Sequence, residues 1–352
     1  MSFKIAIYIH HHGLGHLMRA MEIIKRFPDH ELILMGSNLH FQNALPANVR
    51  VVHLPLDVAN ATDIHYHEGP APDAFHYAPL NVSGIRNRSS IMTDLFRSEF
   101  PMILIVDVSV EVALMARLCG IPTIIMRQHG NREDLPHRLA YQSAELLIAP
   151  YHKSMYCGKA DGALAKTVFT GGFSKFTATE NPAKEISNHI AIMLGSGGSS
   201  LNSRVITEII NTCPDHFFHI LGKTDGDAPD LVNATWHGHL ELPQSIIEGC
   251  RIVIGNTGHN TVMEVASLKK RFIGIPEHRP FGEQLDKAEA IRSRQGIHIL
   301  LPEQLAETNW KHLFTTLQEQ QADWTDVIDP NALVVLRDAI LETANRLFNI
   351  KP

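Results

Sequence analysis

Residues 252–284 contain the arrangement that most restricts the fold of this chain. A β-branched run over 252–254 ends in a Gly-Asn-Thr-Gly turn, and a helix is predicted to begin at about Asn260. A second apolar strand is predicted over 271–275 and is closed by Pro276. A glycine turn that leads into a helix presents backbone N–H groups at the positive end of the helix dipole. The segment therefore predicts an anion site, suited to a phosphate group.

The same alternation of apolar runs and helical periodicity extends through both halves of the chain, which indicates parallel α/β layers. Strands are predicted in the first half at 3–9, 31–35, 50–54, 102–106, 122–126 and 145–149, and helices at 15–27 and 109–119. In the second half the pattern restarts with a strand at 189–194 and a helix at 201–211. The chain is long enough for two domains, predicted as 1–170 and 171–352 and joined by a turn-rich linker at 171–185.

Two segments depart from this alternation. Residues 60–90 are rich in His, Pro, Asp and aromatic residues and have no clear period. A connection of this length is either a functional loop or lid, or an ordered surface excursion. Near the end, 331–349 predicts an amphipathic helix.

Composition excludes several classes of protein. The chain has 352 residues, 44% of them apolar and 19% charged, with a formal net charge of −6, so it lacks the basic surface that nucleic acids require. Its four cysteines show no metal-ligand spacing and are expected to be reduced thiols, which favours the cytoplasm. No run approaches the roughly 20 apolar residues of a membrane span, so at most peripheral membrane contact is expected.

A second glycine-rich loop follows the strand at 189–194. It reads Gly195-Ser196-Gly197-Gly198-Ser199-Ser200, and its amides and hydroxyls are suited to a diphosphate. The loop lacks the Lys of a P-loop, which argues against an ATPase. The simpler alternative is a flexible connection between strand and helix.

The loop after the first strand contains a third candidate site. It reads Gly13-Leu14-Gly15-His16-Leu17-Met18-Arg19, and its glycines permit a tight turn that places His16 at the start of a helix. His16 is predicted to be catalytic, with a helix-start His that only hydrogen-bonds the loop as the alternative. Arg19 is a possible substrate contact through phosphate or an acidic group, or else it pairs with a surface carboxylate.

Asp107 lies at the C-terminal end of the strand over 102–106. Open parallel sheets bind ligands at these strand ends. A carboxylate bonded to the second nitrogen of a His makes that His a stronger base. Asp107 is therefore a second catalytic candidate, and capping of the following helix is the competing role.

These motifs resemble those of UDP-dependent glycosyltransferases. Gly258-His259-Asn260-Thr261 followed by Glu264 resembles the GWNSxxE core of the plant-type donor-binding box, and Pro276 with Glu283-Gln284 matches its downstream proline and acidic-Gln pair. The loop at 195–200 resembles the GGSQGA loop of the bacterial N-acetylglucosaminyltransferase that completes lipid II. Both have the GT-B architecture of two Rossmann-like, doubly wound domains with an interdomain cleft.

The resemblance implies an N-terminal acceptor-binding domain and a C-terminal domain that binds a nucleotide-sugar donor, with the terminal helix at 331–352 crossing back onto the first. His16 would be the base and Asp107 its orienting partner. Glu264 would hold the ribose, Glu283 and Gln284 the sugar, and the backbone near Leu242 the base of the nucleotide. The residues predicted to bind the donor are Gly15, Gly195, Ser196, Gly197, Gly198, Ser199, Leu242, Thr257, Gly258, His259, Asn260, Thr261, Glu264, Glu283 and Gln284.

The predicted reaction is the transfer of a hexosyl group from a UDP-sugar co-substrate to an acceptor hydroxyl, where the acceptor is a glycan, a lipid-linked molecule or a small molecule. None of the three candidate loops is a metal-binding DxD motif, so no metal is expected. The plant-type box has a phosphate-binding His where this chain has Asn256, which would leave phosphate binding to amides and hydroxyls.

Three other functions are compatible with parts of the sequence. GLGHLMR is also similar to the GxGHxxR loop of the UDP-sugar hydrolase of pseudaminic-acid synthesis, in which water would be the acceptor. Non-hydrolysing sugar epimerisation on the same scaffold and a non-catalytic nucleotide-sugar binding protein are the others.

Overall fold

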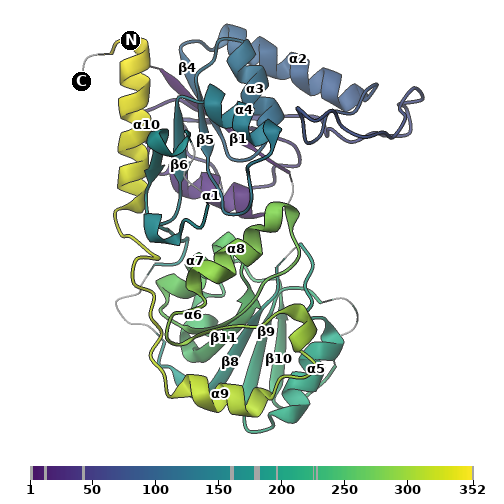
Figure 1. Ribbon diagram of the computed structural model, residues 1–352, viewed down its shortest axis with the longest axis vertical. Helices are drawn as coiled ribbons and strands as arrows, with labels where there is room; N and C mark the ends of the chain where they lie inside the picture. The colour runs from purple at the N-terminus through teal and green to yellow at the C-terminus, as the bar shows by residue number, and fades with distance from the viewer. Residues whose placement is uncertain are drawn as a thin grey trace.

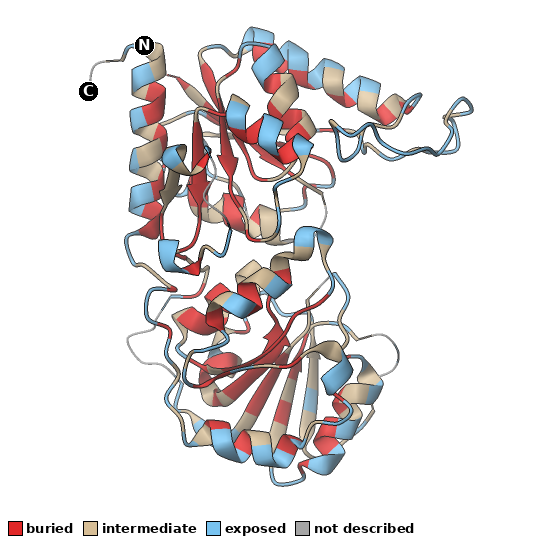
Figure 2. Ribbon diagram, viewed as in Figure 1, coloured by how far each residue is buried: buried red, intermediate tan, exposed pale blue. Residues whose placement is uncertain are grey.

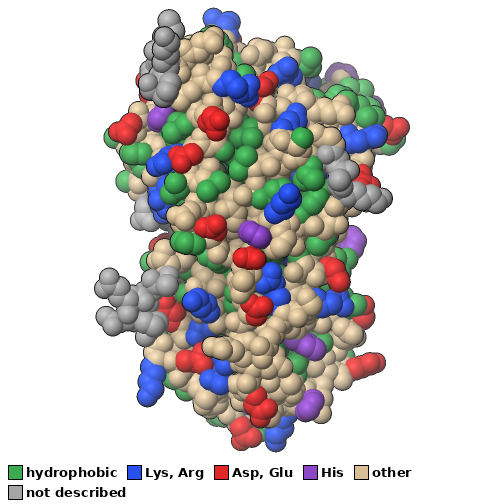
Figure 3. Space-filling model, turned by 60° about the vertical axis from the view of Figure 1, so that its left-hand side comes forward, with side chains coloured by type: hydrophobic (Ala, Val, Ile, Leu, Met, Phe, Trp, Pro, Cys, Tyr) green, Lys and Arg blue, Asp and Glu red, His purple; other side chains and the backbone are tan. Residues whose placement is uncertain are grey.

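The computed structural model forms two lobes stacked along the long axis of the molecule (Figure 1). It describes residues 3–11, 14–41, 44–158, 162–177, 183–195, 197–224, 226 and 229–350. In the space-filling view, a narrow waist separates the lobes, and acidic, basic and His side chains lie close together there (Figure 3).

The first lobe is built on a seven-stranded parallel sheet with the order β3-β2-β1-β4-β5-β6-β7. Its strands are β1 (Lys4–Ile9), β2 (Leu32–Gly36), β3 (Val49–His53), β4 (Met102–Val106), β5 (Thr123–Met126), β6 (Leu146–Ala149) and β7 (Thr167–Phe169). Its helices are α1 (Leu14–Ile24), α2 (Ser83–Ser98), α3 (Val110–Leu118), α4 (Leu135–Ser143) and the short 3₁₀ turns η1 (Lys153–Met155) and η2 (Leu164–Lys166).

The second lobe repeats this plan with a six-stranded parallel sheet in the order β10-β9-β8-β11-β12-β13. Its strands are β8 (Ile186–Met193), β9 (Phe217–Leu221), β10 (Ala234–Gly238), β11 (Cys250–Asn256), β12 (Arg271–Ile275) and β13 (Ile297–Ile299). Its helices are α5 (Ser203–Thr212), α6 (Gln244–Gly249), α7 (His259–Ser267), α8 (Glu283–Ile291), α9 (Trp310–Gln318) and the 3₁₀ turns η3 (Pro280–Gly282) and η4 (Pro302–Gln304).

Helices cover both faces of each sheet, and the core lies in the layers between them. Figure 2 shows buried residues concentrated in the strands and on the inward faces of the helices. Because both faces are buried, the central strands are almost uniformly apolar, which made them recognisable in the sequence. The predicted pair of Rossmann-like, doubly wound sheets is confirmed.

The last helix, α10 (Ala332–Phe348), packs on the first lobe although it follows the second in sequence (Figure 1). Leu336, Ile340 and Ala344 are fully buried in the apolar cluster that also contains residues of β1, β4 and α1. The chain therefore crosses between the lobes twice. Among the described helices, none is long and apolar enough to span a bilayer.

The irregular segment is shorter than the predicted 60–90, because α2 begins at Ser83 and takes its last part. The first buried positions of α2 are Gly84 and Arg88. The apolar residues whose helical spacing would predict a helix are therefore missing from its first two turns. Gly84 lies so close to the backbone of Leu56 that a Cβ there would meet the Leu56 carbonyl oxygen. Arg88 is buried, and its guanidinium forms an ion pair with Asp57. The residues at 54–82 project from the side of the first lobe and are mostly exposed (Figure 2).

A chain of polar contacts fastens this segment to the rest of the protein. His76 Nε2 lies 2.9 Å from Asp134 Oδ1, and His137 Nδ1 lies 2.6 Å from Asp134 Oδ2. The imidazoles of His76 and His137 also pack against the Phe281 ring of the second lobe, with centroids 5.0 Å and 4.7 Å away. The segment thus contacts both lobes.

The position of α10 gives a test of the fold. We expect Leu336→Ala to lower the free energy of unfolding by about 2–5 kcal/mol, because it leaves a cavity in a fully buried layer. Denaturation in urea followed by circular dichroism measures the change. Val334→Ala, on the outer side of the same helix, should change the free energy by no more than about 0.5 kcal/mol. Equal losses in the two variants would contradict the packing described.

Candidate functional site

A cavity of about 270 Å³ lies between the two lobes and is called the central cleft. Its lining combines the loops at the carboxyl ends of the strands in both sheets, which is where open parallel sheets bind ligands. The first lobe contributes Gly15, His16, Arg19, Gln128, His129, Pro150 and Tyr151. The second lobe contributes Gly195, Gly197, residues 256–261, Arg279, Glu283, Gln284 and Lys287.

His16 and Asp107 form a short hydrogen bond in the first lobe. His16 Nδ1 lies 2.6 Å from Asp107 Oδ2, and Arg19 Nη1 lies 3.4 Å from Asp107 Oδ1. Burial alone would raise the pKa of Asp107, but the positive charges of Arg19 and His16 outweigh it and lower that pKa. An ionised Asp107 accepts the Nδ1 proton, which leaves His16 Nε2 as the ring nitrogen with a free lone pair.

The competing role for Asp107, capping of α3, belongs to another residue. Ser109 is the N-cap, and its hydroxyl oxygen accepts from the Val112 N–H at 3.3 Å. The Arg19 guanidinium is buried against Asp107, and among the described residues it pairs with no surface carboxylate, so the second of its two predicted roles is not observed.

The predicted anion cradle at the start of α7 is built as a braced turn. Asn256 Oδ1 accepts from the Gly258 N–H at 2.9 Å and from the Thr261 hydroxyl at 3.2 Å. The Thr257 hydroxyl donates to the Gln284 carbonyl at 2.7 Å, which ties the turn to α8. The N–H groups of the first helical turn have no partner within the helix and border the cleft. Asn256 thus holds the shape of the cradle.

The glycine-rich loop, residues 195–200, is held by a residue that the sequence analysis missed. Glu277 Oε1 accepts from the Ser200 N–H at 2.6 Å, the Ser200 hydroxyl at 2.8 Å and the Ser199 hydroxyl at 3.0 Å. Gly195 and Gly197 line the central cleft, while Gly198 and Ser199 line a second cavity of about 410 Å³ that adjoins it. Ser196 lies outside the described residues. The Ser199 hydroxyl therefore donates its proton to Glu277 in this structure.

Two cations in the cleft were also missed. The Arg279 guanidinium donates to the Gly198 carbonyl at 2.7 Å, and the Lys287 ammonium lies 3.3 Å from His259 Nδ1. Both charges line the cleft beside the amides and hydroxyls predicted to bind phosphate, and the contacts of a phosphate group stay a prediction. Single charges in a polar loop and on a short amphipathic helix look like solvated surface in a sequence, so no local pattern announced them.

The remaining predicted donor residues occupy different positions. Glu283 and Gln284 line the central cleft, and the Gln284 side-chain oxygen accepts from the Glu277 N–H at 2.9 Å. Glu264 lines a small neighbouring pocket and pairs with Lys175 at 3.4 Å. Burial raises the pKa of Glu264. Leu242 is exposed and away from the cleft lining, so its contact with a base stays a prediction.

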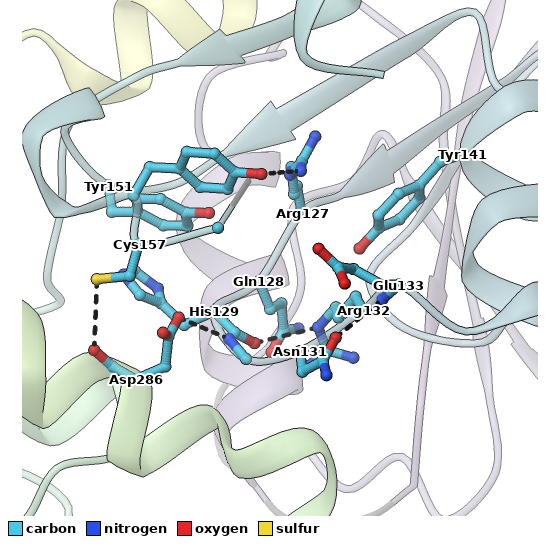
Figure 4. Close-up of a pocket in the computed structure, with 13 residues that line it drawn as sticks. Arg127, Gln128, His129, Asn131, Arg132, Glu133, Tyr141, Tyr151, Cys157 and Asp286 are labelled. Carbon is cyan, nitrogen blue, oxygen red and sulfur yellow. Dashed lines mark hydrogen bonds between the residues drawn. The ribbon is translucent and has the colours of Figure 1, made fainter. Parts of the chain in front are cut away.

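A third cavity of about 240 Å³ opens beside the cleft in the first lobe (Figure 4). It is called the tyrosine cavity because Tyr141, Tyr151 and Tyr156 line it. The Arg127 guanidinium lies over the Tyr156 ring at 4.8 Å and donates to the Tyr156 hydroxyl at 2.5 Å. Tyr151 borders both cavities, and its buried hydroxyl has no hydrogen-bond partner in the described structure.

No family model matches the chain, and no curated protein sequence matches it. Solved structures match over nearly its full length. MurG from Acinetobacter baumannii aligns with a TM-score of 0.63 at 17% identity, over 96% of this chain and 99% of that one. A UDP-glucosyltransferase from Polygonum tinctorium gives 0.65 at 13% identity over 100% and 99%. Phytolacca americana UGT2, complexed with UDP-2-fluoro-glucose and pterostilbene, gives 0.63 at 14% over 98% and 94%. The chain therefore has the GT-B fold, as its motifs predicted.

The role of Glu277 can be tested directly. We expect Glu277→Gln to weaken three hydrogen bonds to the glycine-rich loop, because a neutral amide is a poorer acceptor than a carboxylate. Hydrogen–deuterium exchange at 197–202 should become faster by about tenfold or more, since bonds to a charged group contribute about 1.5–3 kcal/mol.

Glu289→Gln is the matched control, because Glu289 lies on α8 and pairs with Arg292 on the surface. Exchange at 197–202 should be unchanged in this variant. Unchanged exchange in Glu277→Gln as well would show that Glu277 does not hold the loop.

Proposed function

We propose that this protein is a glycosyltransferase that moves a hexosyl group from a nucleoside diphosphate donor, with uridine as the expected nucleoside, to an acceptor hydroxyl. One observation carries the proposal. The anion cradle at the start of α7 and the His16–Asp107 pair come from different lobes and line or border the same cleft. A transferase of this kind needs both, because the leaving group is an anion and the nucleophile must lose a proton.

The donor diphosphate is assigned to the space between the glycine-rich loop and the first turn of α7. Backbone N–H groups of 259–261 and the helix dipole favour negative charge there. Arg279 adds a guanidinium beside Gly197 and Gly198. Together they stabilise the charge that develops as the nucleotide diphosphate leaves. The resemblance to glycosyltransferase motifs and the bound UDP-2-fluoro-glucose of the Phytolacca americana enzyme support this assignment.

His16 is assigned as the general base. Its Nε2 takes the proton of the acceptor hydroxyl, whose oxygen forms a bond to the anomeric carbon as the bond to the diphosphate oxygen breaks. Asp107 fixes the orientation of the imidazole and stabilises the positive charge that His16 acquires. Arg19 keeps Asp107 ionised in a buried site.

The acceptor is assigned to the first lobe, next to His16, with the tyrosine cavity as additional space. That cavity shares Gln128, His129 and Tyr151 with the cleft. The Tyr151 hydroxyl and the Gln128 amide nitrogen are buried and have no hydrogen-bond partner among the described residues, so each is available to a polar group of a bound molecule. Water in the acceptor position would give hydrolysis of the donor by the same residues.

Nucleotide binding is the first prediction from this proposal. A thermal-shift panel of UDP, TDP, GDP and their glucose esters should show one base that raises the melting temperature, because a ligand bound only to the native state stabilises it by mass action. At a concentration of 100 times its Kd, the expected gain is about 2.7 kcal/mol. ATP serves as the control, since the loop lacks the Lys of a P-loop. No shift with any nucleoside diphosphate would contradict the proposed donor site.

Removal of the base is the second prediction. His16→Ala should slow release of the nucleoside diphosphate by about 10²–10⁴-fold, because general base catalysis contributes a factor of this size. Its affinity for the diphosphate should stay within about twofold, since His16 belongs to the other lobe. Coupled detection of the released diphosphate measures the rate.

His40→Ala, an exposed position in the first lobe, is the control and should keep full activity. Release at full rate without any added acceptor would identify the reaction as hydrolysis. Wild-type rates in His16→Ala would contradict its role as base.

A further inference from the structure

Lys287 is a buried amine that the reaction described above does not use. Its side chain comes from the second turn of α8 and is almost fully buried while lining the central cleft. The ammonium donates to His259 Nδ1 at 3.3 Å and lies 5.1 Å from the centroid of the Tyr151 ring. It therefore sits between the first residue of α7 and the wall of the first lobe.

No carboxylate neutralises this ammonium within the described part of the chain. The two acidic residues nearest to it on α8 contact the first lobe instead. Asp286 Oδ2 accepts from the Gly130 N–H at 2.9 Å, and Glu283 lies 3.5 Å from Arg132. A buried charge without a counter-charge is unfavourable, which marks the position as one where a ligand supplies the anion.

The surroundings of Lys287 add positive charge. Burial, followed by the charge of Arg19, lowers the pKa of Lys287 to about 7, although Asp286, Glu283 and Cys157 act in the opposite direction. Burial and then the charge of Lys287 lower the pKa of His259 and His129 well below the usual range. The groups that face Lys287 from neighbouring elements are Arg19 on α1, His129 and Tyr151 in the first lobe, His259 on α7, and Glu283 and Asp286 on α8.

Lys287 and Arg279 contact different parts of the cleft lining. The glycine-rich loop and Arg279 flank the diphosphate on the side of the second lobe. Lys287 lies toward the first lobe, and the charges of both Lys287 and His16 contribute to the lowered pKa of His259. On the proposed function the transferred sugar lies between the diphosphate and His16. Because Lys287 reaches from His259 to the Tyr151 ring of the first lobe, we assign its ammonium to the sugar side of this space.

We infer that Lys287 selects a donor whose transferred sugar carries a carboxylate, as in a nucleotide-linked uronic acid. The inference rests on the proposed function and makes it more specific. The carboxylate of the sugar forms an ion pair with the Lys287 ammonium. It takes the place of the protein carboxylate that would otherwise neutralise a buried lysine. A neutral hydroxymethyl group in the same place would leave the buried ammonium unpaired.

Matched pairs of donors test this inference. The affinities of UDP-glucuronate and UDP-glucose, and of UDP-galacturonate and UDP-galactose, are compared by calorimetry with that of UDP alone. We expect the acidic member of one pair to bind at least about 30-fold more tightly than its neutral partner, as for a buried charge pair. Lys287→Met should abolish this preference, Lys287→Arg should retain part of it, and neither should change the affinity for UDP by more than about twofold.

The preference for the acidic donor should depend on pH. A lysine that only stabilises the fold would not produce such a dependence. The free amine is protonated below pH 7 and neutral above it, so the affinity for the acidic donor should fall by about tenfold per pH unit above 7. The neutral donor should show no such fall, and Lys287→Met should remove the effect.

Lys270 provides the matched control. It is buried in the same lobe, but its ammonium pairs with Glu185 at 3.2 Å and donates to the Glu248 carbonyl. Lys270→Met should lower stability and leave the donor preference unchanged.

Two results would overturn the inference while leaving the proposed function intact. One is equal affinity of the wild-type protein for acidic and neutral donors. The other is an equal loss of UDP, UDP-glucose and UDP-glucuronate affinity in Lys287→Met, which would assign Lys287 to the diphosphate. Failure of every nucleotide to bind would instead contradict the proposed function itself.

Discussion

The contact between Gly15 and Asn260 sets the relation between the two halves of the cleft. The Asn260 side-chain amide, on the first turn of α7, donates to the Gly15 carbonyl at 3.3 Å across the domain boundary. A Cβ on Gly15 would lie 3.0 Å from the Asn260 side-chain nitrogen, so a larger residue there would push this side chain back. His16 is the next residue, and its distance from the anion cradle is therefore fixed by this contact. The crossing of α10 back onto the first lobe limits how far the lobes can move apart.

Charge is distributed unevenly in the cleft. The first lobe balances its own ions, because Arg19 and His16 surround the buried carboxylate of Asp107. The second lobe does not, since within the described residues Arg279 donates to backbone carbonyls and the Lys287 ammonium contacts a neutral ring. The uncompensated charge thus lies on the side of the cleft to which an anionic donor is assigned. Backbone amides at the helix start add to the same field.

Much of the fold could be predicted from the sequence, because buried parallel strands are uniformly apolar and glycine loops follow them. The segment around Asn260, predicted as an anion cradle, lies in the cleft lining, and its binding of an anion stays a prediction. Long-range contacts were less accessible. Glu277 acts on a loop more than seventy residues away in sequence, and Lys287 looks like an ordinary surface residue of an amphipathic helix. Helix α2 was missed because its first inward positions hold glycine and arginine.

The packing of His76 and His137 on Phe281 joins the projecting segment to the lobe that carries the donor site. Phe281 has a positive φ of 61°, a conformation that bulky residues rarely adopt, and its carbonyl oxygen accepts from the Asn131 N–H at 2.8 Å. Any hinge rotation that widens the space between the lobes must withdraw this ring from both imidazoles. The closed arrangement of the lobes therefore also determines whether His76 of the outer segment keeps its aromatic contact with the second lobe.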